Sequence, residues 1–437
     1  MYLGRWVSLR ILALVLFLFT PLRVIGAELT DTEIGSFRAL VEERRLGPPE
    51  VKGGPLTGEE TSVLRGLLDR FDGVGFGGFI ANYYQYESVD PPAGDQNAIP
   101  PMDIAVQVNS FTVNNIELWL FKGAPEPGDI GFNISLDWGD FARRITQNGP
   151  VRDDTAVQPN PPGAPTGGRQ TTFSEAYLLY NLPVGKGLTV KFGKFPSWIE
   201  FESWVPLWNP NFTNSYIDVY GAIGTVTGVG LGYPVTDRFT ANYYFINSFD
   251  TFVNNNKSFM HGLQLDYNPP DLAFFKDINI NLDTLWGPDH ESNNSDWHQV
   301  YNLEFSFSPL DKVVLITNSI IHSEPKGIKQ PSGKIKRDNH MWGVAQYLIY
   351  DFTDRIGLAF RGEYYWDHDN MGELAGGTAG ASLAEVTGTL NLRLRERVMV
   401  RPEVRYDKII SVDNGPAHIW QGHNKNVTGL IAVTYEF

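Results

Sequence analysis

The sequence predicts an all-β fold: a transmembrane antiparallel β-barrel of about 16 strands, preceded by a short N-terminal helical segment. Three observations support this prediction. Many runs alternate between apolar and polar residues, their connections alternate between short and long, and the chain starts with a pattern typical of exported proteins. A closed ring of such strands satisfies every backbone polar group inside a bilayer.

Residues 1–27 have the pattern of a signal peptide. Arg5 and Arg10 supply the positive start, an apolar stretch follows from Ile11 to Thr20, and Ile25–Ala27 is a suitable cleavage site. The apolar stretch is too short for a membrane anchor, because a spanning helix needs about 20 such residues. We therefore expect export and a place in the outer membrane of a Gram-negative cell.

Residues 28–72 differ in pattern from the rest of the chain. Two short helices are expected at Asp31–Leu46 and Gly58–Phe71, because a capping-box pattern precedes each of them. This segment forms either a periplasmic extension or a plug-like element in the barrel mouth. The sequence leaves both alternatives open.

Residues 73–437 contain the strand-length runs, and no helix is expected among them. In one clean run, Ile130, Phe132, Ile134, Leu136 and Trp138 alternate with small or polar residues. A period of two residues places the apolar set on one face of a strand. A soluble β-sandwich alternates in the same way, so this pattern alone does not decide between the two folds.

The connections favour the barrel. Short ones such as Pro234–Asp237 and Asp351–Asp354 alternate along the chain with long ones such as Arg143–Thr172 and Phe195–Ser215. Short turns at one rim and long loops at the other are typical of outer-membrane barrels. Tryptophan and tyrosine residues near the strand ends fit the two aromatic belts of such proteins.

Composition narrows the function. The chain carries a formal charge of −15, which removal of residues 1–27 with their three arginines would lower to −18. An acidic surface argues against nucleic acid as a partner. The absence of cysteine excludes disulfides, thiolate metal sites and cysteine nucleophiles. We expect no cofactor.

Several segments, taken in order, resemble the OmpL-like family of outer-membrane β-barrel porins. They are Phe111–Leu118, Gly131–Gly139, Ala176–Leu179, Val190–Lys194, Glu200–Glu202, Thr227–Gly228 with Asp237–Arg238, Leu394–Asp407 and Gly429–Phe437. The resemblance covers roughly residues 73–437 and leaves out the helical segment.

That resemblance implies a channel and supplies no catalytic residues. It implies that outer-membrane lipid and lipopolysaccharide surround the barrel, and that the assembly machinery reads the terminal aromatic residue, Phe437. A homotrimer is expected by analogy with similar porins.

Inward positions of a barrel this wide should be polar and line a water-filled lumen. The expected pore-lining acids are Glu117, Asp137, Glu175, Asp266, Asp283, Glu304, Glu363, Glu385, Glu403 and Asp407. The expected pore-lining bases are Lys191, Arg361, Arg393, Arg395, Arg401 and Arg405. The arginines near the C-terminus either pair with neighbouring acids and stabilise the wall, or form a basic wall that faces an acidic constriction.

The candidate constriction is the connection Phe195–Ser215, which is rich in tryptophan. Its acids Glu200 and Glu202, with the nearby Asp218, would set negative charge across from the arginines. Small hydrophilic solutes or ions would then diffuse passively through the lumen. The excess of acidic residues predicts a mild preference for cations.

Other functions remain to be weighed against this hypothesis. A barrel enzyme at the membrane rim would need Ser319 with His322, or His298 with Glu304. A gated channel for apolar solutes would use residues 28–72 as its hatch, and an adhesin would have a closed lumen. The acidic stretch Asp367–Glu373 lacks full calcium-loop spacing, so we interpret it as a solvated loop.

Overall fold

The computed structural model describes residues 73–89, 108–139, 141–142, 171–199, 201–249, 251, 253–290, 293–324, 328–329, 335–336, 339–369, 371, 380–395, 397–413 and 423–437. The expected signal peptide and N-terminal helices lie outside these residues. Among the described residues, no helix is both long enough and apolar enough to cross a membrane.

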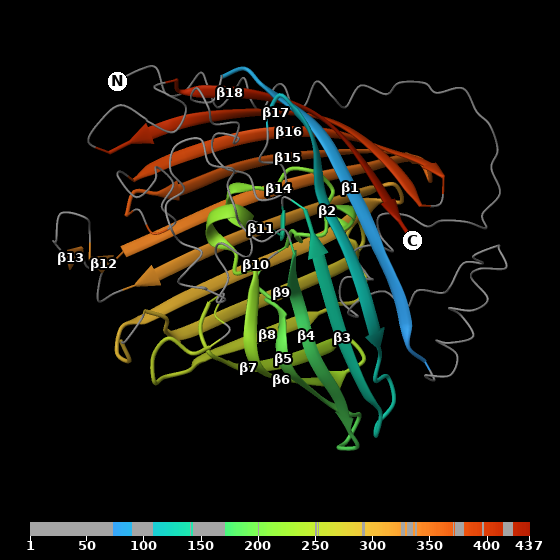
Figure 1. The fold of residues 1–437 in the computed structure, drawn as a ribbon, viewed down its shortest axis with the longest axis vertical. Helices are drawn as coiled ribbons and strands as arrows, with labels where there is room; N and C mark the ends of the chain where they lie inside the picture. Colours follow the sequence, from blue (N-terminus) through green and yellow to red (C-terminus); the bar gives the residue numbers. More distant parts are fainter. Residues whose placement is uncertain are drawn as a thin grey trace. The chain divides into compact units, whose positions relative to one another are not determined.

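Sixteen antiparallel strands form one closed barrel, as the sequence predicts (Figure 1). They are β1 (Gly75–Glu87), β2 (Ser110–Lys122), β3 (Ile130–Trp138), β4 (Thr171–Leu182), β5 (Leu188–Pro196), β6 (Thr225–Thr236), β7 (Phe239–Ile246), β8 (Met260–Tyr267), β9 (Lys276–Pro288), β10 (Trp297–Leu310), β11 (Val313–Glu324), β14 (Asn339–Thr353), β15 (Ile356–Asp367), β16 (Ala381–Arg395), β17 (Val398–Val412) and β18 (Lys425–Glu436).

Each strand pairs with its neighbours in sequence, and β1 pairs with β18 to close the ring. The closing register sets Phe79 opposite Glu436 and Tyr86 opposite Gly429. Backbone hydrogen bonds between Gly78 and Phe437 extend this ladder to the last residue. A small separate sheet pairs β12 (Ile328–Lys329) with β13 (Ile335–Lys336), between β11 and β14.

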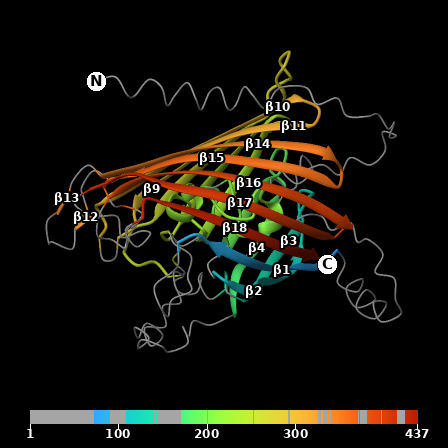
Figure 2. The same cartoon turned by 90° about the horizontal axis from the view of Figure 1, so that it is seen from above.

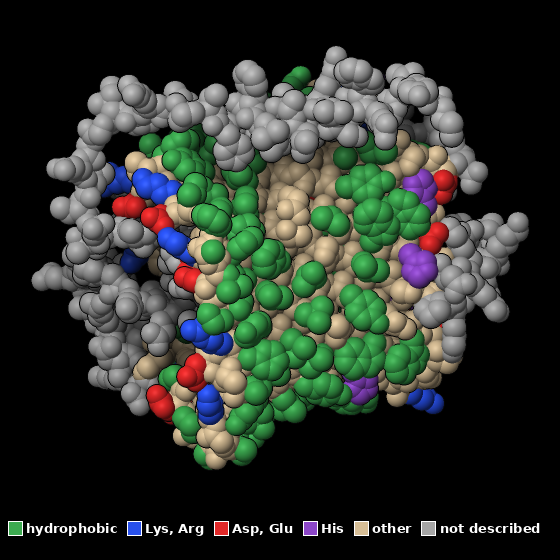
Figure 3. Space-filling view, turned by 180° about the vertical axis from the view of Figure 1, so that it is seen from behind, with side chains coloured by type: hydrophobic (Ala, Val, Ile, Leu, Met, Phe, Trp, Pro, Cys, Tyr) green, Lys and Arg blue, Asp and Glu red, His purple; other side chains and the backbone are tan. Residues whose placement is uncertain are grey.

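The strands are polar inside and apolar outside. On β17, Arg401, Glu403 and Arg405 are buried, whereas the intervening Val404 is 61% exposed and Tyr406 is 40% exposed. Apolar side chains spread over the outer face of the barrel (Figure 3). A soluble protein buries its apolar face, so this inverted pattern decides between the sandwich and the membrane barrel.

Short and long connections alternate around most of the ring, as expected, although the two that flank β9, residues 268–275 and 289–296, are equal in length. The connection after β5 differs from the predicted one in its bounds. The strand β5 extends to Pro196, and the connection continues through residue 224, nine residues beyond the predicted end at Ser215. We call residues 197–224 the inner segment.

The inner segment also corrects the expectation that no helix follows residue 73. It contains a 3₁₀ turn, η2 (Pro206–Trp208), and a one-turn π-helix, η3 (Ile217–Gly221). Each is only one turn long, and such short elements leave too little periodicity to recognise in a sequence. Figures 1 and 2 show this segment, in green, enclosed by the ring of strands.

Candidate functional site

The inner segment lies in the lumen, because it touches strands from several sides of the ring. Four aromatic contacts make this clear: Trp198 with Tyr244 on β7, Phe201 with Tyr347 on β14, Trp208 with Trp119 on β2, and Phe212 with Tyr83 on β1. The tryptophans that mark this connection in the sequence therefore pack against the inner wall.

Part of the inner wall is apolar, which corrects the expectation of a uniformly polar lumen. Ile316 and Ile320 on β11 and Met341 on β14 are buried in one cluster with Ile199 and Ile217 of the inner segment. The physical reason is that the inner segment supplies its own apolar side chains. These strand positions therefore pack against protein and do not face water.

Close packing is visible at Gly262 on β8. A Cβ atom added there would come within 1.9 Å of the ring of Trp198. The indole ring stacks on Tyr244 with centroids 3.6 Å apart and an angle of 6° between the planes. Glycine at this position leaves the space in which the tryptophan lies.

Asparagine side chains stabilise the fold of the inner segment itself. The side-chain oxygen of Asn209 accepts a hydrogen bond from the backbone N–H of Ser203 at 2.8 Å, and its Nδ2 donates to the carbonyl of Ser203 at 2.6 Å. Asn214 Nδ2 donates to the carboxylate of Asp218 at 2.6 Å. Such local bonds satisfy backbone groups that a sheet would otherwise pair.

Arg361 on β15 joins the inner segment to the wall. Its guanidinium donates to Glu202 at 2.6 Å, to Glu385 on β16 at 2.5 Å and to the carbonyl of Thr213 at 2.6 Å. All three charged side chains are fully buried. A buried charge is costly unless it is paired, so this arginine requires both acids.

Two further arginines on β17 bind the inner segment by its carbonyl groups. Arg405 donates to the carbonyl of Asn214 at 2.5 Å and to Asp407 at 2.7 Å. Arg401 donates to the carbonyl of Leu207 at 3.3 Å and also to that of Pro206. A guanidinium has five donors in a fixed planar arrangement, which suits such convergent contacts.

Acids of the same wall accept hydrogen bonds from consecutive backbone N–H groups of the inner segment. Glu403 accepts from the N–H groups of Phe212 and Thr213 at 2.6 and 3.0 Å. Glu363 accepts from those of Tyr216 and Ile217, both at 2.6 Å. Successive N–H groups that converge on one carboxylate are a recurring anion-binding geometry. We call this set of contacts on β15–β17 the arginine wall.

Strands β2–β4, on the other side of the β1–β18 closure, carry acids whose hydrogen-bond donors are neutral. Trp119 Nε1 donates to Glu117 at 2.6 Å, Asn115 Nδ2 to Asp137 at 2.7 Å, and Asn133 Nδ2 to Glu175 at 2.5 Å. No described lysine or arginine nitrogen lies within 4.0 Å of these three carboxylates. We call these residues of β2–β4 the acidic wall.

Two more predicted acids and the predicted lysine lie on the same inner face. Asp283 on β9 and Glu304 on β10 both accept hydrogen bonds from Asn302, at 3.1 and 3.3 Å. The ammonium of Lys191 on β5 lies 4.9 Å from the ring centroid of Tyr177 and 5.3 Å from that of Phe195. A lysine over aromatic rings is stabilised without an acid partner.

The remaining predicted residues fall at the margins. Arg393 lies near a short turn and donates to the carbonyl of Asp354 at 3.3 Å. Asp218 is half-buried within the inner segment, and Asp266 accepts from Asn268 at 2.8 Å. Glu200 and the side chain of Arg395 lie outside the described part of the chain.

The inner segment lies against the arginine wall, so Glu202 and Arg361 are in contact. The sequence analysis expected the acids of this segment to lie across from the arginines, with pairing between the arginines and neighbouring wall acids as the alternative. The arginines pair with wall acids and with the inner segment at once. Sequence reasoning missed the backbone partners and Thr389, which donates to Glu403 at 2.6 Å. Nothing in an isolated sequence indicates which carbonyl an arginine will meet.

The residues expected for a rim enzyme are not assembled as expected. His322 is buried on the inner face of β11, and Ser319 lies an odd number of residues away, on the outer face. His298 Nε2 meets His322 Nδ1 at 2.8 Å and His298 Nδ1 meets Asp289 at 2.9 Å, so Glu304 is not its partner.

The geometry defines a β-barrel with an inverted polarity and a segment folded into its lumen, which is the architecture of an outer-membrane channel. Residues 73–437 match the family described as "Putative beta-barrel porin-2, OmpL-like". The chain belongs to this family, as the sequence resemblance indicated.

Solved structures with the same fold share little sequence with this chain. The outer membrane channel DcaP of Acinetobacter baumannii aligns with TM-score 0.54 and 12% identity over 83% of this chain and 97% of its own. Pseudomonas putida OprB, in a high pH structure, aligns with TM-score 0.56 and 12% identity over 87% and 98%. The anion-selective porin from Comamonas acidovorans aligns with TM-score 0.51 and 12% identity over 83% and 99%. A comparison with curated proteins finds no match.

Proposed function

We propose that this porin forms a water-filled channel for passive diffusion of small hydrophilic solutes or ions, with a mild preference for cations. The inner segment narrows the lumen and is the constriction. The family and the barrel support the channel. The charged side chains on the inner face of the barrel support the preference of the channel for cations.

The balance of charge inside the barrel carries the proposal for cations. At the arginine wall, the guanidinium groups of Arg361, Arg401 and Arg405 are engaged by the inner segment or by neighbouring acids. Within the described residues, the carboxylates of the acidic wall accept hydrogen bonds from neutral donors and form no ion pair within 4.0 Å. Negative charge on a low-dielectric wall raises the local concentration of cations.

We further propose that the barrel has no catalytic role, since Ser319 and His322 lie on opposite faces of one strand. Export by means of residues 1–27 and assembly as a homotrimer stay predictions. The mass of the purified complex in detergent tests the second of these.

Planar-bilayer recording of the purified chain tests the channel and its preference together. In a gradient of potassium chloride, we expect the reversal potential to have the sign that results when potassium is more permeant than chloride. A current that is absent at all voltages contradicts the channel. A reversal potential of the opposite sign contradicts the assignment of preference to the acidic wall.

A further inference from the structure

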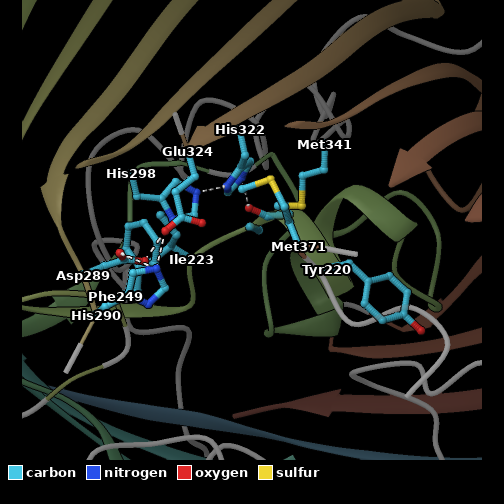
Figure 4. Close-up of a pocket in the computed structure, with 12 residues that line it drawn as sticks. Tyr220, Ile223, Phe249, Asp289, His290, His298, His322, Glu324, Met341 and Met371 are labelled. Carbon is cyan, nitrogen blue, oxygen red and sulfur yellow. Dashed lines mark hydrogen bonds and ion pairs between the residues drawn. The ribbon is translucent and has the colours of Figure 1, made fainter. Parts of the chain in front are cut away.

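We propose that Asp289, His290 and Glu324 form a binding site for a divalent transition-metal ion of the zinc type, at the barrel end that carries the long connections. Asp289 and His290 directly follow β9, and Glu324 ends β11. One ligand atom from each residue lies within 4.8 Å of the other two. Figure 4 shows the three side chains turned toward one another.

The donor set has the right chemistry for such an ion. One imidazole nitrogen and two carboxylate oxygens suit zinc, which binds these atoms at about 2.0–2.2 Å and takes water as a further ligand. The three residues border a cavity of about 210 Å³ that has room for the ion and water. His290 is 42% exposed, so its ring can adjust to the ion, whereas Glu324 is held at 1% exposure.

Asp289 has a ligand atom to offer. Its Oδ2 accepts a hydrogen bond from His298 at 2.9 Å, but within the described residues its buried Oδ1 has no hydrogen-bond donor. That oxygen lies 3.9 Å from Nε2 of His290. A buried carboxylate oxygen without a donor is costly to maintain, and a metal ion would satisfy it.

A chain of hydrogen bonds orients Asp289 from behind. His322 Nε2 donates to the carbonyl of Gly221 at 2.8 Å, which leaves Nδ1 of a neutral His322 to accept from His298 at 2.8 Å. His298 then presents its Nδ1–H to Asp289. Partners of this kind fix the ligands of known metal sites. Gly221 belongs to η3, so the chain links the site to the inner segment.

Without metal, a proton occupies the place of the ion. The hydrogen bond to Glu324 raises the pKa of His290 to about 9, burial opposes this shift, and the charges of Asp289, Glu324 and Asp296 add to it. At neutral pH the His290 imidazolium therefore offsets one of the two carboxylate charges of Asp289 and Glu324.

The test is calorimetric titration of the metal-free full chain in detergent with zinc chloride at pH 7.5. The expected result is saturable binding of one ion per barrel. Glu324→Gln and His290→Asn should each weaken binding by about tenfold or more. Cobalt chloride in place of zinc should give visible absorption bands that both variants lose.

His368→Asn is the matched control, because His368 pairs with an acid, Asp413, at 2.9 Å near other long connections. This variant should bind zinc as the parent chain does. Circular dichroism and resistance to heat in detergent verify that each variant is folded. Absence of one-to-one binding in the parent chain, or equal affinity in the folded Glu324→Gln variant, overturns the proposal. The binding assay needs no conductance, so it can fail while the channel function stands.

Discussion

The two charged walls of the lumen use their charges in opposite ways. At the arginine wall, Arg361 is fully buried and contacts Glu202, Glu385 and a carbonyl group. At the acidic wall, Glu117 and Glu175 are equally enclosed but contact only neutral donors. The first wall uses its charges to hold a segment in place, whereas the second holds its acids with neutral hydrogen-bond donors. Counting ionisable residues along the pore would miss this difference.

The largest expected effect follows from Arg361→Met. The change leaves Glu202 and Glu385 as buried acids without their cation. Loss of one partner of a buried pair costs about 3–5 kcal/mol. The free energy of unfolding in urea should fall by about that amount. The inner segment should also become sensitive to protease, and the single-channel conductance should rise.

Arg393→Met is the control for this change. Like Arg361 on β15, Arg393 on β16 faces inward. Its side chain is 18% exposed, however, and its Nη1 lies 3.7 Å from Oδ1 of Asp351 near a short turn. The same loss of charge there should leave the inner segment resistant to protease. Equal effects of the two variants would show that Arg361 contributes bulk charge and not an anchor.

A smaller effect is expected from the double change Glu117→Gln and Glu175→Gln on the acidic wall. Glutamine keeps the size of each side chain and can still accept from Trp119 and Asn133, so the barrel should fold. The ratio of cation to anion permeability, measured from the reversal potential, should fall on the order of twofold because negative charge has left the wall.

Glu126→Gln, in the exposed connection between β2 and β3, removes one negative charge outside the lumen. It should leave the permeability ratio unchanged. A preference that survives the double change would mean that charges elsewhere set it.

The sequence was sufficient to predict the ring of strands but not the contacts of the inner segment within it. Alternation of residues such as Ile130 and Phe132 is a local signal with a period of two, and a lipid environment makes its interpretation nearly unique. It yields the strands, their order and the inward face of Arg401 and Glu403. The tryptophans of the inner segment, such as Trp198, even indicated which connection packs against the wall.

The position of the inner segment in the lumen depends on contacts between residues far apart in sequence. Glu202 and Arg361 are 159 residues apart, and the partners of Arg405 and Glu403 in the inner segment are backbone groups. Almost every residue has a backbone carbonyl and N–H group, so the residue types in the sequence do not indicate which backbone groups form these contacts. The cluster of Asp289, His290 and Glu324 likewise forms only when β9 and β11 reach the same rim.

The smallest effect is expected where an ion pair lies in water. Lys186 and Asp237 form a 2.8 Å pair across two short turns, with Asp237 97% exposed. The hydrogen bond and charge of Lys186 hold the pKa of Asp237 below its usual range. Such a pair stabilises the fold above the usual pKa of aspartate, and this contribution disappears as the pH falls through the lowered value.

Water and salt screen the exposed pair, in contrast to Arg361 with Glu202. We therefore expect Lys186→Gln to unfold at the same urea concentration as the parent chain at pH 7, and acidification to pH 3 to change both by the same amount. Urea titrations at the two pH values measure this. A clear loss of stability at pH 7 alone would mean that position in the barrel matters less than charge pairing itself, and the contrast between buried and exposed pairs would have to be abandoned.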